Sequence, residues 1–486
     1  MKKLSLGFIL MLLVASFVSC KKTEYITIAP EPEPTDTSTY TIMMYGCGGE
    51  NLDPAMVLNI QEALLAGATD RVNFTGQIKF SAAYQKEEVL SGTQRFIVGE
   101  PGEKWFEPVE VLDTNLALYD PQTLTDFINW SKEQRPADNY ILLLWNHGGA
   151  WLPDDDYYNQ DSRAIVYDDV LGKKGLSLSN LVKGIKDSGT KFKMIYFDAC
   201  LMGMVEVLAG VRDCADYSMG ASHITPGMGG DYNSLIYHLD KSTNFEQAMT
   251  AYVSETIAHW ELDNSALDLM VVDNSKMDLL LNEIKVLGGY LKEAATVYND
   301  YLAGKYGQLD FDAQLLCETY ATAINNCYHY DDSYFQNGIA AYPFYDIQTL
   351  VEILAHGVGG THSYSAKFVD ISSRINRAFS ETIVTKQLTS VLAGANLGMG
   401  VTIVNNTVWD AYQYQEAYDT LVFQQETGWG DWLKINPVYP IGNPDPSKIA
   451  QSGEGEDEGE EDEDEEGGEM TDDLWIQYIL SLIGKD

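Results

Sequence analysis

Short apolar runs alternate with amphipathic, helix-length segments along most of this chain, and this alternation constrains the fold more than any other sequence feature. Neighbouring parallel strands need a long crossover connection between them, and that connection is usually a helix. The alternation therefore predicts an α/β fold in which helices cover a mostly parallel central sheet. The predicted strands are residues 41–45, 78–83, 95–98, 141–145 and 194–197.

Helix signals lie between these strands. Asp120 is a suitable N-cap, and Pro121 is a suitable first residue for the helix that follows it, because its missing N–H needs no partner there. A second helix is predicted over residues 179–186, directly before the strand at 194–197.

The same pattern continues in the second half of the chain. Residues 266–291 predict a strand followed by a long amphipathic helix, and residues 398–405 predict a further strand. No repeat of fixed period interrupts this pattern. We therefore expect one large domain over residues 40–434, with a helical subdomain around residues 276–328.

The first residues have the features of an export signal. Two lysines precede an apolar run over residues 4–18, and Ser19 then precedes Cys20. Residues 1–20 resemble a bacterial lipoprotein signal, in which Cys20 becomes the lipidated first residue; a plain secretory signal cleaved nearby is the alternative. Residues 21–39, rich in proline and threonine, are expected to tether the domain to a membrane. The expected location is the cell envelope, at the outer membrane, facing the periplasm or the surface.

The distribution of charge argues against nucleic acid as a partner and separates an acidic tail from the rest of the chain. A net charge of -41 leaves no basic surface for nucleic acid. Residues 454–469 hold twelve acids and no base, which favours a disordered, solvated spacer over weak calcium binding, within a linker over residues 435–470. Residues 471–486 predict a short amphipathic helix that docks on its own domain, a partner or a bilayer, of which self-docking is favoured.

Five cysteines remain when Cys20 is set aside. An odd number leaves at least one thiol unpaired, and none of the spacings matches a zinc site. We expect most of the five to be small buried apolar residues. They are Cys47, Cys200, Cys214, Cys317 and Cys327.

Two predicted strands end in reactive side chains. His147 follows one in "ILLLWNHGGAW", and Cys200 follows another in "MIYFDACLMGMVE". Parallel sheets bind ligands outside the carboxyl ends of their strands, so both side chains face one cleft if the strands are neighbours. A cysteine at a helix amino terminus has a lowered thiol pKa, and Gly148 and Gly149 allow close backbone approach to a carbonyl. The set suits acyl transfer, although buried cysteines and histidines with structural roles are commoner.

Both motifs resemble the His-Gly and Asp-Ala-Cys signatures of the clostripain family of cysteine peptidases, which are related in fold to caspases, legumains and gingipains. The similarity extends over residues 40–434. It includes the segments "DPQTLTDFINWSKEQRPADNYILLLWNHGGAW", "DDVLGKKGLSLSNLVKGIK", "KFKMIYFDACLMGMVEV", "ASHITPGMGGDYNSL" and "YDTLVFQQETGWGDWLK". The resemblance implies a caspase-like α/β/α sandwich and peptide-bond hydrolysis through a thioester.

The resemblance also implies roles for individual residues. Cys200 is the nucleophile and His147 is its acid/base partner, while the backbone N–H groups of Gly148 and Cys200 form the oxyanion hole. Asp198 corresponds to the acid at the base of the S1 pocket, where it attracts an arginine or lysine side chain. The alternative for Asp198 is a strand-end carboxylate that caps the following helix.

One loop departs from the family pattern. Relatives often have Ser-Glu and then Pro-Gly-Asp-Gly-Trp, whereas this chain has Ser222 and His223 and then "PGMGG" with Met228. The missing carboxylate at Met228 weakens the case for a basic P1 residue, because a buried guanidinium needs a matching charge. Asp231 is a candidate substitute for it. His223 is expected at the surface, with substrate contact as the alternative.

The segment between His147 and Cys200 resembles the region in which relatives are cleaved for activation. It is polar and contains glycine, as a susceptible loop should. The candidate cleavage sites are Arg163, Lys173 and Lys174.

Some members of the family depend on calcium. Five acids flank the same loop, namely Asp154, Asp155, Asp156, Asp168 and Asp169. They match no fixed calcium-loop spacing, so a solvated acidic loop is the favoured interpretation. We expect no required cofactor, with calcium as an open alternative.

Together these features predict an exported cysteine endopeptidase that cleaves peptides or proteins after arginine or lysine. A peptidase of the same fold with another P1 preference is one alternative. A catalytically idle lipoprotein that binds peptides or partners is another, although an idle site would have no need of His147 and Cys200 in these glycine and alanine settings.

Overall fold

The computed structural model describes residues 38–49, 51–152, 165–172, 174–261, 266–307, 310–330, 343–357, 364–411, 414–438, 440 and 472–482. The chain divides into two compact units, Met1–Thr35 and Asp36–Asp486. The first unit, which contains Cys20, lies outside the described residues, and so does the acidic run over residues 454–469. The fold below is that of the second unit.

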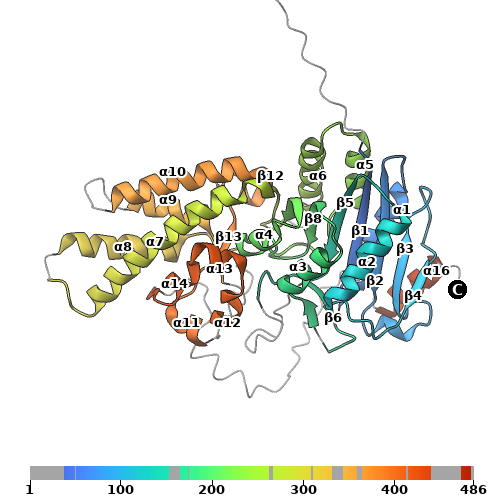
Figure 1. Ribbon diagram of the computed structural model, residues 1–486, viewed down its shortest axis with the longest axis horizontal. Coiled ribbons are helices and arrows are strands. Elements are labelled where there is room, and N and C mark those ends of the chain that lie inside the picture. The colour runs from blue at the N-terminus through green and yellow to red at the C-terminus, as the bar shows by residue number, and fades with distance from the viewer. Residues whose placement is uncertain are drawn as a thin grey trace, which may run out of the picture. The chain divides into compact units, whose positions relative to one another are not determined.

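A nine-stranded sheet forms the centre of this unit (Figure 1). The order of its strands is β12-β10-β9-β8-β5-β1-β2-β3-β4. Their bounds are β1 Tyr40–Cys47, β2 Val72–Lys79, β3 Thr93–Ile97, β4 Glu110–Leu112, β5 Asn139–Trp145, β8 Phe192–Asp198, β9 Ala215–Gly220, β10 Asp268–Asp273 and β12 Ile383–Leu388.

The centre of the sheet is parallel and its two flanks are antiparallel. β2, β1, β5, β8 and β9 pair in parallel, whereas β3, β4, β10 and β12 pair antiparallel to their neighbours. All eight residues of β1 are buried, because helices cover both faces of the sheet and leave no polar side. The predicted α/β class with a mostly parallel sheet is therefore confirmed.

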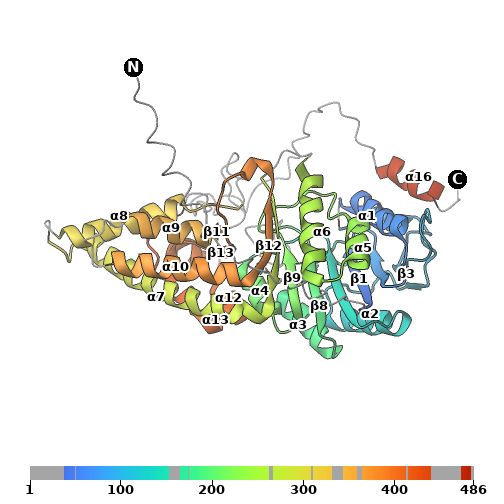
Figure 2. The same cartoon turned by 90° about the horizontal axis from the view of Figure 1, so that it is seen from above.

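Successive residues of the central strands point into two separate cores. Ile42 and Met44 of β1 lie in one core, and Met43 and Tyr45 lie in the other. Helices α1 (Asp53–Ala66), α5 (Tyr232–Lys241) and α6 (Phe245–Trp260) cover the first face. Helices α2 (Pro121–Gln134), α3 (Leu178–Asp187) and α4 (Val205–Val211) cover the second, as Figure 2 shows from above.

The second half of the unit is mostly helical. α7 (Met277–Leu302), α8 (Phe311–Asn326), α9 (Ile347–Gly357) and α10 (Ser365–Thr382) pack on one another. The short helices that follow are α11 (Asn406–Ala411), α12 (Tyr414–Asp419), α13 (Val422–Thr427) and α14 (Trp429–Leu433). Two small sheets pair β6 (Ile165–Asp168) with β7 (Lys174–Leu176) and β11 (Phe344–Asp346) with β13 (Gly400–Thr402).

Most predicted elements are present, with two displacements. The strand predicted at residues 78–83 begins earlier, as β2, because the polar side chains before Ile78 are buried and hydrogen-bonded: Thr75 Oγ1 donates to Ser131 Oγ at 3.0 Å. The strand predicted within residues 398–405 is β13, which pairs with β11 outside the main sheet. The N-cap prediction is confirmed, since Asp120 accepts the Gln122 N–H at 2.8 Å.

A helix near the end of the chain, α16 (Asp472–Leu482), contacts α1. The Gln61 side chain donates to the Tyr478 hydroxyl at 3.2 Å, and Ile476 packs at the edge of the first core. Among the described helices, none combines the length and the apolar character needed to cross a bilayer.

All five cysteines outside the first unit are free thiols. Cys47, Cys214, Cys317 and Cys327 are buried, and Cys200 is half-buried. The expectation that most of them are buried apolar residues is confirmed.

Candidate active site

His147 and Cys200 leave adjacent strands at matching positions. β5 and β8 are parallel neighbours, and Trp145 at the end of β5 pairs with Asp198 at the end of β8. Each reactive residue therefore follows its strand by the same number of residues, at the carboxyl edge of the sheet, where parallel folds place ligands. The two side chains are both half-buried.

The backbones of the two loops are in contact at Gly148. A Cβ atom built on Gly148 would lie 2.3 Å from the Cys200 carbonyl oxygen and 3.1 Å from the Cys200 nitrogen. Gly148 also forms an isolated antiparallel bridge with Ile165 at the start of β6. The backbone of Gly148 thus packs closely against that of Cys200, which is possible because residue 148 has no side chain.

We expect Gly148→Ala to lower kcat/KM by about 100-fold, because the added methyl must push the His147 loop away from Cys200 and misplace the reacting groups. Steady-state hydrolysis of a fluorogenic peptide measures this loss. Gly289→Ala on α7 is the matched control, since a Cβ there meets nothing within 4 Å. Equal kcat/KM values for the Gly148→Ala variant and the parent would contradict the expectation.

His147 is held by residues that the sequence did not single out. Its Nε2 lies 2.9 Å from Asn51 Oδ1, and this contact holds the orientation of the imidazole ring. The neighbouring Asn146 accepts the Tyr167 N–H at 2.6 Å and donates to the Cys47 carbonyl at 2.6 Å. These bonds fix the loop between the ends of β1 and β6.

Cys200 lies in a turn and not at a helix terminus, so that prediction is wrong. α4 begins only at Val205, after a turn in which Leu201 has φ +61°. Burial raises the pKa of the Cys200 thiol, and hydrogen bonds with Thr225 only partly oppose it. The Thr225 N–H lies 3.3 Å from Cys200 Sγ. Burial thus disfavours the thiolate, and a neighbouring base would assist its formation.

Asp198 is buried beneath the loop that corresponds to the substrate pocket. Its Oδ2 accepts the Gly230 N–H at 2.9 Å and the Tyr232 hydroxyl at 2.6 Å. α4 has no side-chain cap, so the alternative role of Asp198 as its cap is wrong. Burial raises the pKa of Asp198, and the bonds from Tyr232 and Gly230 oppose that rise.

Met228 and Asp231 lie on either side of Gly229 and Gly230 in the chain, and the Gly230 N–H bonds Asp198. Met228 is half-buried, packs at the edge of the first core, and its carbonyl accepts a bond from Asn59 at 2.8 Å. Asp231 is the N-cap of α5, where it accepts the Ser234 N–H at 3.0 Å.

Glu62, which the sequence gave no reason to choose, also contacts the pocket loop. Its Oε2 accepts the Tyr232 N–H at 3.2 Å and a bond from Asn59 at 3.1 Å. Burial, together with the charges of Asp231 and Asp198, raises the pKa of Glu62 to about 7, although the bonds from Asn59 and Tyr232 oppose this rise. Three acids therefore surround the loop.

His223 is buried and not at the surface, so that expectation is wrong. Only 3% of the residue is exposed. Its Nδ1 lies 2.6 Å from Asp268 Oδ1, and its Nε2 lies 2.9 Å from the Tyr328 hydroxyl. The sequence could not reveal this burial, because both partners come from distant segments.

Of the three candidate cleavage sites, only Lys174 belongs to the described residues. It is exposed at the start of β7. Arg163 and Lys173 lie outside the described ranges.

The calcium candidates that the structure describes are engaged within the protein. Asp168 forms a buried ion pair with Lys79 at 2.8 Å, and Asp169 accepts the Ala82 N–H at 3.1 Å. Asp154, Asp155 and Asp156 lie outside the described residues. In the described part of the chain, no three His, Cys, Asp or Glu side chains lie close enough together to hold a metal ion.

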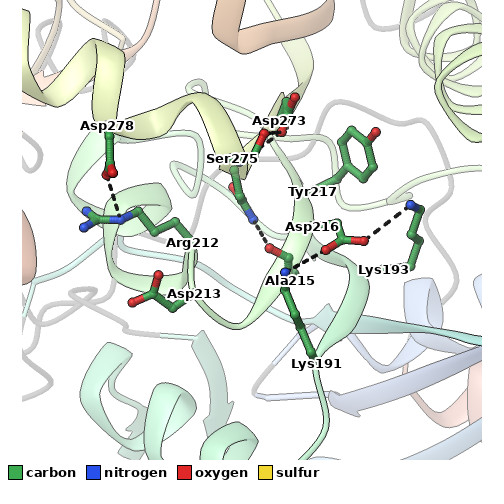
Figure 3. Close-up of a pocket in the computed structure, with 11 residues that line it drawn as sticks. Lys191, Lys193, Arg212, Asp213, Ala215, Asp216, Tyr217, Asp273, Ser275 and Asp278 are labelled. Atoms are coloured by element: carbon green, nitrogen blue, oxygen red, sulfur yellow. Dashed lines mark hydrogen bonds and ion pairs between the residues drawn. The ribbon is translucent and has the colours of Figure 1, made fainter.

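A separate cavity of about 510 Å³ lies at the opposite end of β8 (Figure 3). It is lined by charged side chains that pair with one another, as in the contacts of Asp216 with Lys191 at 2.8 Å and with Lys193 at 3.4 Å. β8 runs from Phe192 to Asp198, so this cavity is roughly 20 Å from the Cys200 turn at ~3.3 Å per residue. It plays no part in the candidate site.

Comparisons with known proteins agree with this geometry. Residues 99–435, more than half of the chain, match the clostripain family. Clostripain from Hathewaya histolytica is 25% identical over 373 residues, which cover 70% of each chain.

Two solved structures share the fold. An inactive zymogen C11 protease from Parabacteroides distasonis has a TM-score of 0.55 at 18% identity, over 80% of this chain and 99% of that one. A secreted C11 cysteine protease from Bacteroides thetaiotaomicron, in complex with an irreversible peptide inhibitor, has a TM-score of 0.54 at 15% identity, with the same coverage. The chain therefore belongs to the clostripain family and is a cysteine peptidase that acts on peptides or proteins.

Proposed function

We propose that Cys200 and His147 form the catalytic dyad of an endopeptidase. His147 accepts the thiol proton, and the Cys200 sulfur attacks the scissile carbonyl carbon while the Gly148 and Cys200 amides stabilise the oxyanion. The C–N bond then breaks, His147 returns the proton to the leaving amine, and water hydrolyses the thioester. The observation that carries this proposal is the contact of the Gly148 backbone with that of Cys200.

A preference for arginine or lysine at P1 is part of the proposal. It is supported by the acids around the pocket loop, where Asp198 is buried and Glu62 and Asp231 lie near it. Clustered carboxylates repel one another, and a bound guanidinium or ammonium group relieves this repulsion. The Met228 side chain supports the alternative of an apolar P1 residue.

A panel of fluorogenic peptides with Arg, Lys, Asp, Asn or Leu at P1 tests this preference. We expect the parent to favour Arg and Lys, and Asp198→Asn to lower kcat/KM for these two by about 10- to 100-fold, the value of one lost buried charge contact. Asparagine retains an oxygen that accepts bonds from Gly230 and Tyr232, so the fold is kept. If the parent instead favours Leu at P1, and Asp198→Asn does not change the preference among P1 residues, the result would support a pocket for an apolar P1 residue.

We also propose activation by cleavage between His147 and Cys200, after Arg163, Lys173 or Lys174. The exposure of Lys174 supports this, and a related structure is of an inactive zymogen. We expect a triple alanine variant at these positions to stay a single chain and to have at least tenfold lower activity, measured by gel electrophoresis and peptide hydrolysis. If the uncleaved parent chain is already fully active, cleavage is not needed for activation and this proposal is wrong.

The envelope location remains a proposal that rests on residues 1–20 and on Cys20. Lipidation there would hold the peptidase at the outer membrane of a bacterium. Cys20→Ala should then move the protein from the membrane fraction to the soluble fraction, and an unchanged distribution would exclude a lipid anchor at Cys20.

A further inference from the structure

A buried carboxylate, Asp268, contacts polar groups from two segments, residues 222–223 and Lys386, behind the turn that carries Cys200. Its Oδ1 accepts the N–H groups of Ser222 and His223, at 2.9 and 3.0 Å, and contacts the His223 ring at 2.6 Å. Its Oδ2 lies 2.9 Å from Lys386 Nζ on β12. Burial alone would raise the pKa of Asp268, but Lys386 and His223 outweigh it and hold the pKa below its ordinary value. Asp268 is therefore ionised in the fold.

His223 connects this carboxylate to the helical half of the unit. Its Nε2 contacts the Tyr328 hydroxyl at 2.9 Å, and its ring packs edge-on against Tyr330 with the centroids 4.8 Å apart. Tyr330 in turn donates to Asp346 at 2.7 Å. The two ring nitrogens of His223 thus have partners on opposite sides, which fixes the orientation of the ring.

The main chain around His223 supports the turn that carries Cys200. The His223 carbonyl accepts the Leu201 N–H at 3.0 Å, and the Ala221 carbonyl accepts the Gly203 N–H at 2.6 Å. Leu201 has φ +61°, a left-handed conformation that is unfavourable for a non-glycine residue and persists only when its surroundings impose it. The segment that contains Ala221 and His223 imposes it here.

We propose that Asp268 and His223 are positioning residues for Cys200. Asp268 fixes the backbone at residues 222–223, and this backbone holds the strained turn that aims the sulfur at the substrate carbonyl. The inference rests on the proposed role of Cys200.

Only an ionised carboxylate suits the position of Asp268. It accepts from two backbone N–H groups, an imidazole and an ammonium group at once, whereas an amide would turn its NH₂ group toward Lys386. We therefore expect Asp268→Asn to lower kcat by about 10- to 100-fold, through misplacement of the sulfur, while KM changes less than about threefold.

Two substitutions at His223 separate the roles of its ring nitrogens. Asparagine places its NH₂ group near the position of Nδ1 and keeps the bond to Asp268, whereas glutamine reaches toward Tyr328 and loses it. We expect His223→Asn to retain most of the parent kcat and His223→Gln to lose about tenfold. Tyr328→Phe, which removes only the hydroxyl, should resemble His223→Asn.

Alkylation by iodoacetamide provides a readout that does not depend on hydrolysis. Cys200 is half-buried while the other four thiols of this unit are buried, so the rate that disappears in Cys200→Ser belongs to Cys200. We expect Asp268→Asn to slow this alkylation at pH 7 about tenfold, because the sulfur no longer faces its base.

The kcat values of all variants are expressed per active site, and the concentration of active sites is measured by titration with an irreversible peptide inhibitor.

A matched control comes from another histidine–acid pair. His238 Nε2 lies 3.0 Å from Glu255, between α5 and α6, so Glu255→Gln should leave kcat and the alkylation rate unchanged. Parent-like kcat and alkylation rate in Asp268→Asn and His223→Gln would overturn the inference, even if the melting temperature falls. If Cys200→Ser keeps the parent activity, the proposed function fails instead, and the alkylation rates still test the positioning.

Discussion

Replacing Cys200 by alanine is expected to lower kcat by about four to six orders of magnitude, since a dyad that loses its nucleophile keeps only binding and oxyanion stabilisation. His147→Ala should have an effect of similar size, because burial raises the pKa of the Cys200 thiol. A neutral thiol is a poor nucleophile, and its proton must be removed by a neighbouring base. The double variant should be no slower than either single variant.

Steady-state kinetics on a fluorogenic peptide measures these losses, with protein that has already been cleaved between His147 and Cys200. Asn51→Ala is an informative companion, because it removes the contact at 2.9 Å that holds the imidazole without removing a reacting group. We expect it to lower kcat by about 10- to 100-fold. Hydrolysis at the parent rate by Cys200→Ala would exclude the assigned nucleophile, and failure of the parent to hydrolyse any peptide would favour a binding protein.

Removal of Lys79 should cause the largest loss of stability among the substitutions considered. Lys79 Nζ and Asp168 Oδ2 are 2.8 Å apart, and neither side chain is exposed. Lys79→Ala leaves Asp168 as a buried charge without its counter-ion, which typically destabilises a protein by about 3–5 kcal/mol. Urea unfolding measures this change in the free energy of unfolding.

Two control variants test whether the loss of stability in Lys79→Ala comes from the unpaired buried charge. Lys183→Ala breaks an exposed ion pair with Asp187 and should change the free energy of unfolding by less than about 1 kcal/mol. The double variant Lys79→Met/Asp168→Leu removes both buried charges and should recover most of the stability lost in Lys79→Ala. A Lys79→Ala variant as stable as Lys183→Ala would show that the buried pair contributes little.

The sequence was sufficient for the parts of the site that depend on local patterns. The apolar runs of β5 and β8 are recognisable because both faces of the central sheet are covered, and His147 and Cys200 follow directly from these runs. β9, with small and polar residues in "ADYSMG", and the half-buried β12, with "IVTKQL", carry no such signal. Their pairing is decided by neighbours distant in the sequence.

The side-chain contacts of the site could not be predicted in the same way. Thr225 bonds Cys200 across 25 residues, and Asn51 contacts His147 across 96 residues. Such partners are chosen by the tertiary fold, and a lone threonine or asparagine has many equivalent positions in a chain. The prediction that Cys200 lies at a helix terminus was wrong for a related reason. The residues after Cys200 favour a helix, but hydrogen bonds to the segment around His223 hold them in a turn.

The free thiols have a consequence for how this protein responds to oxidation. Burial raises the pKa of Cys47 and Cys327 above the ordinary value, and raises the pKa of Cys214 and Cys317 to about 11. Disulfide exchange requires an accessible thiolate, which these side chains do not offer once folded. These four thiols are thus protected from disulfide exchange in the folded unit, which leaves the half-buried Cys200 as the thiol of this unit that oxidation reaches first.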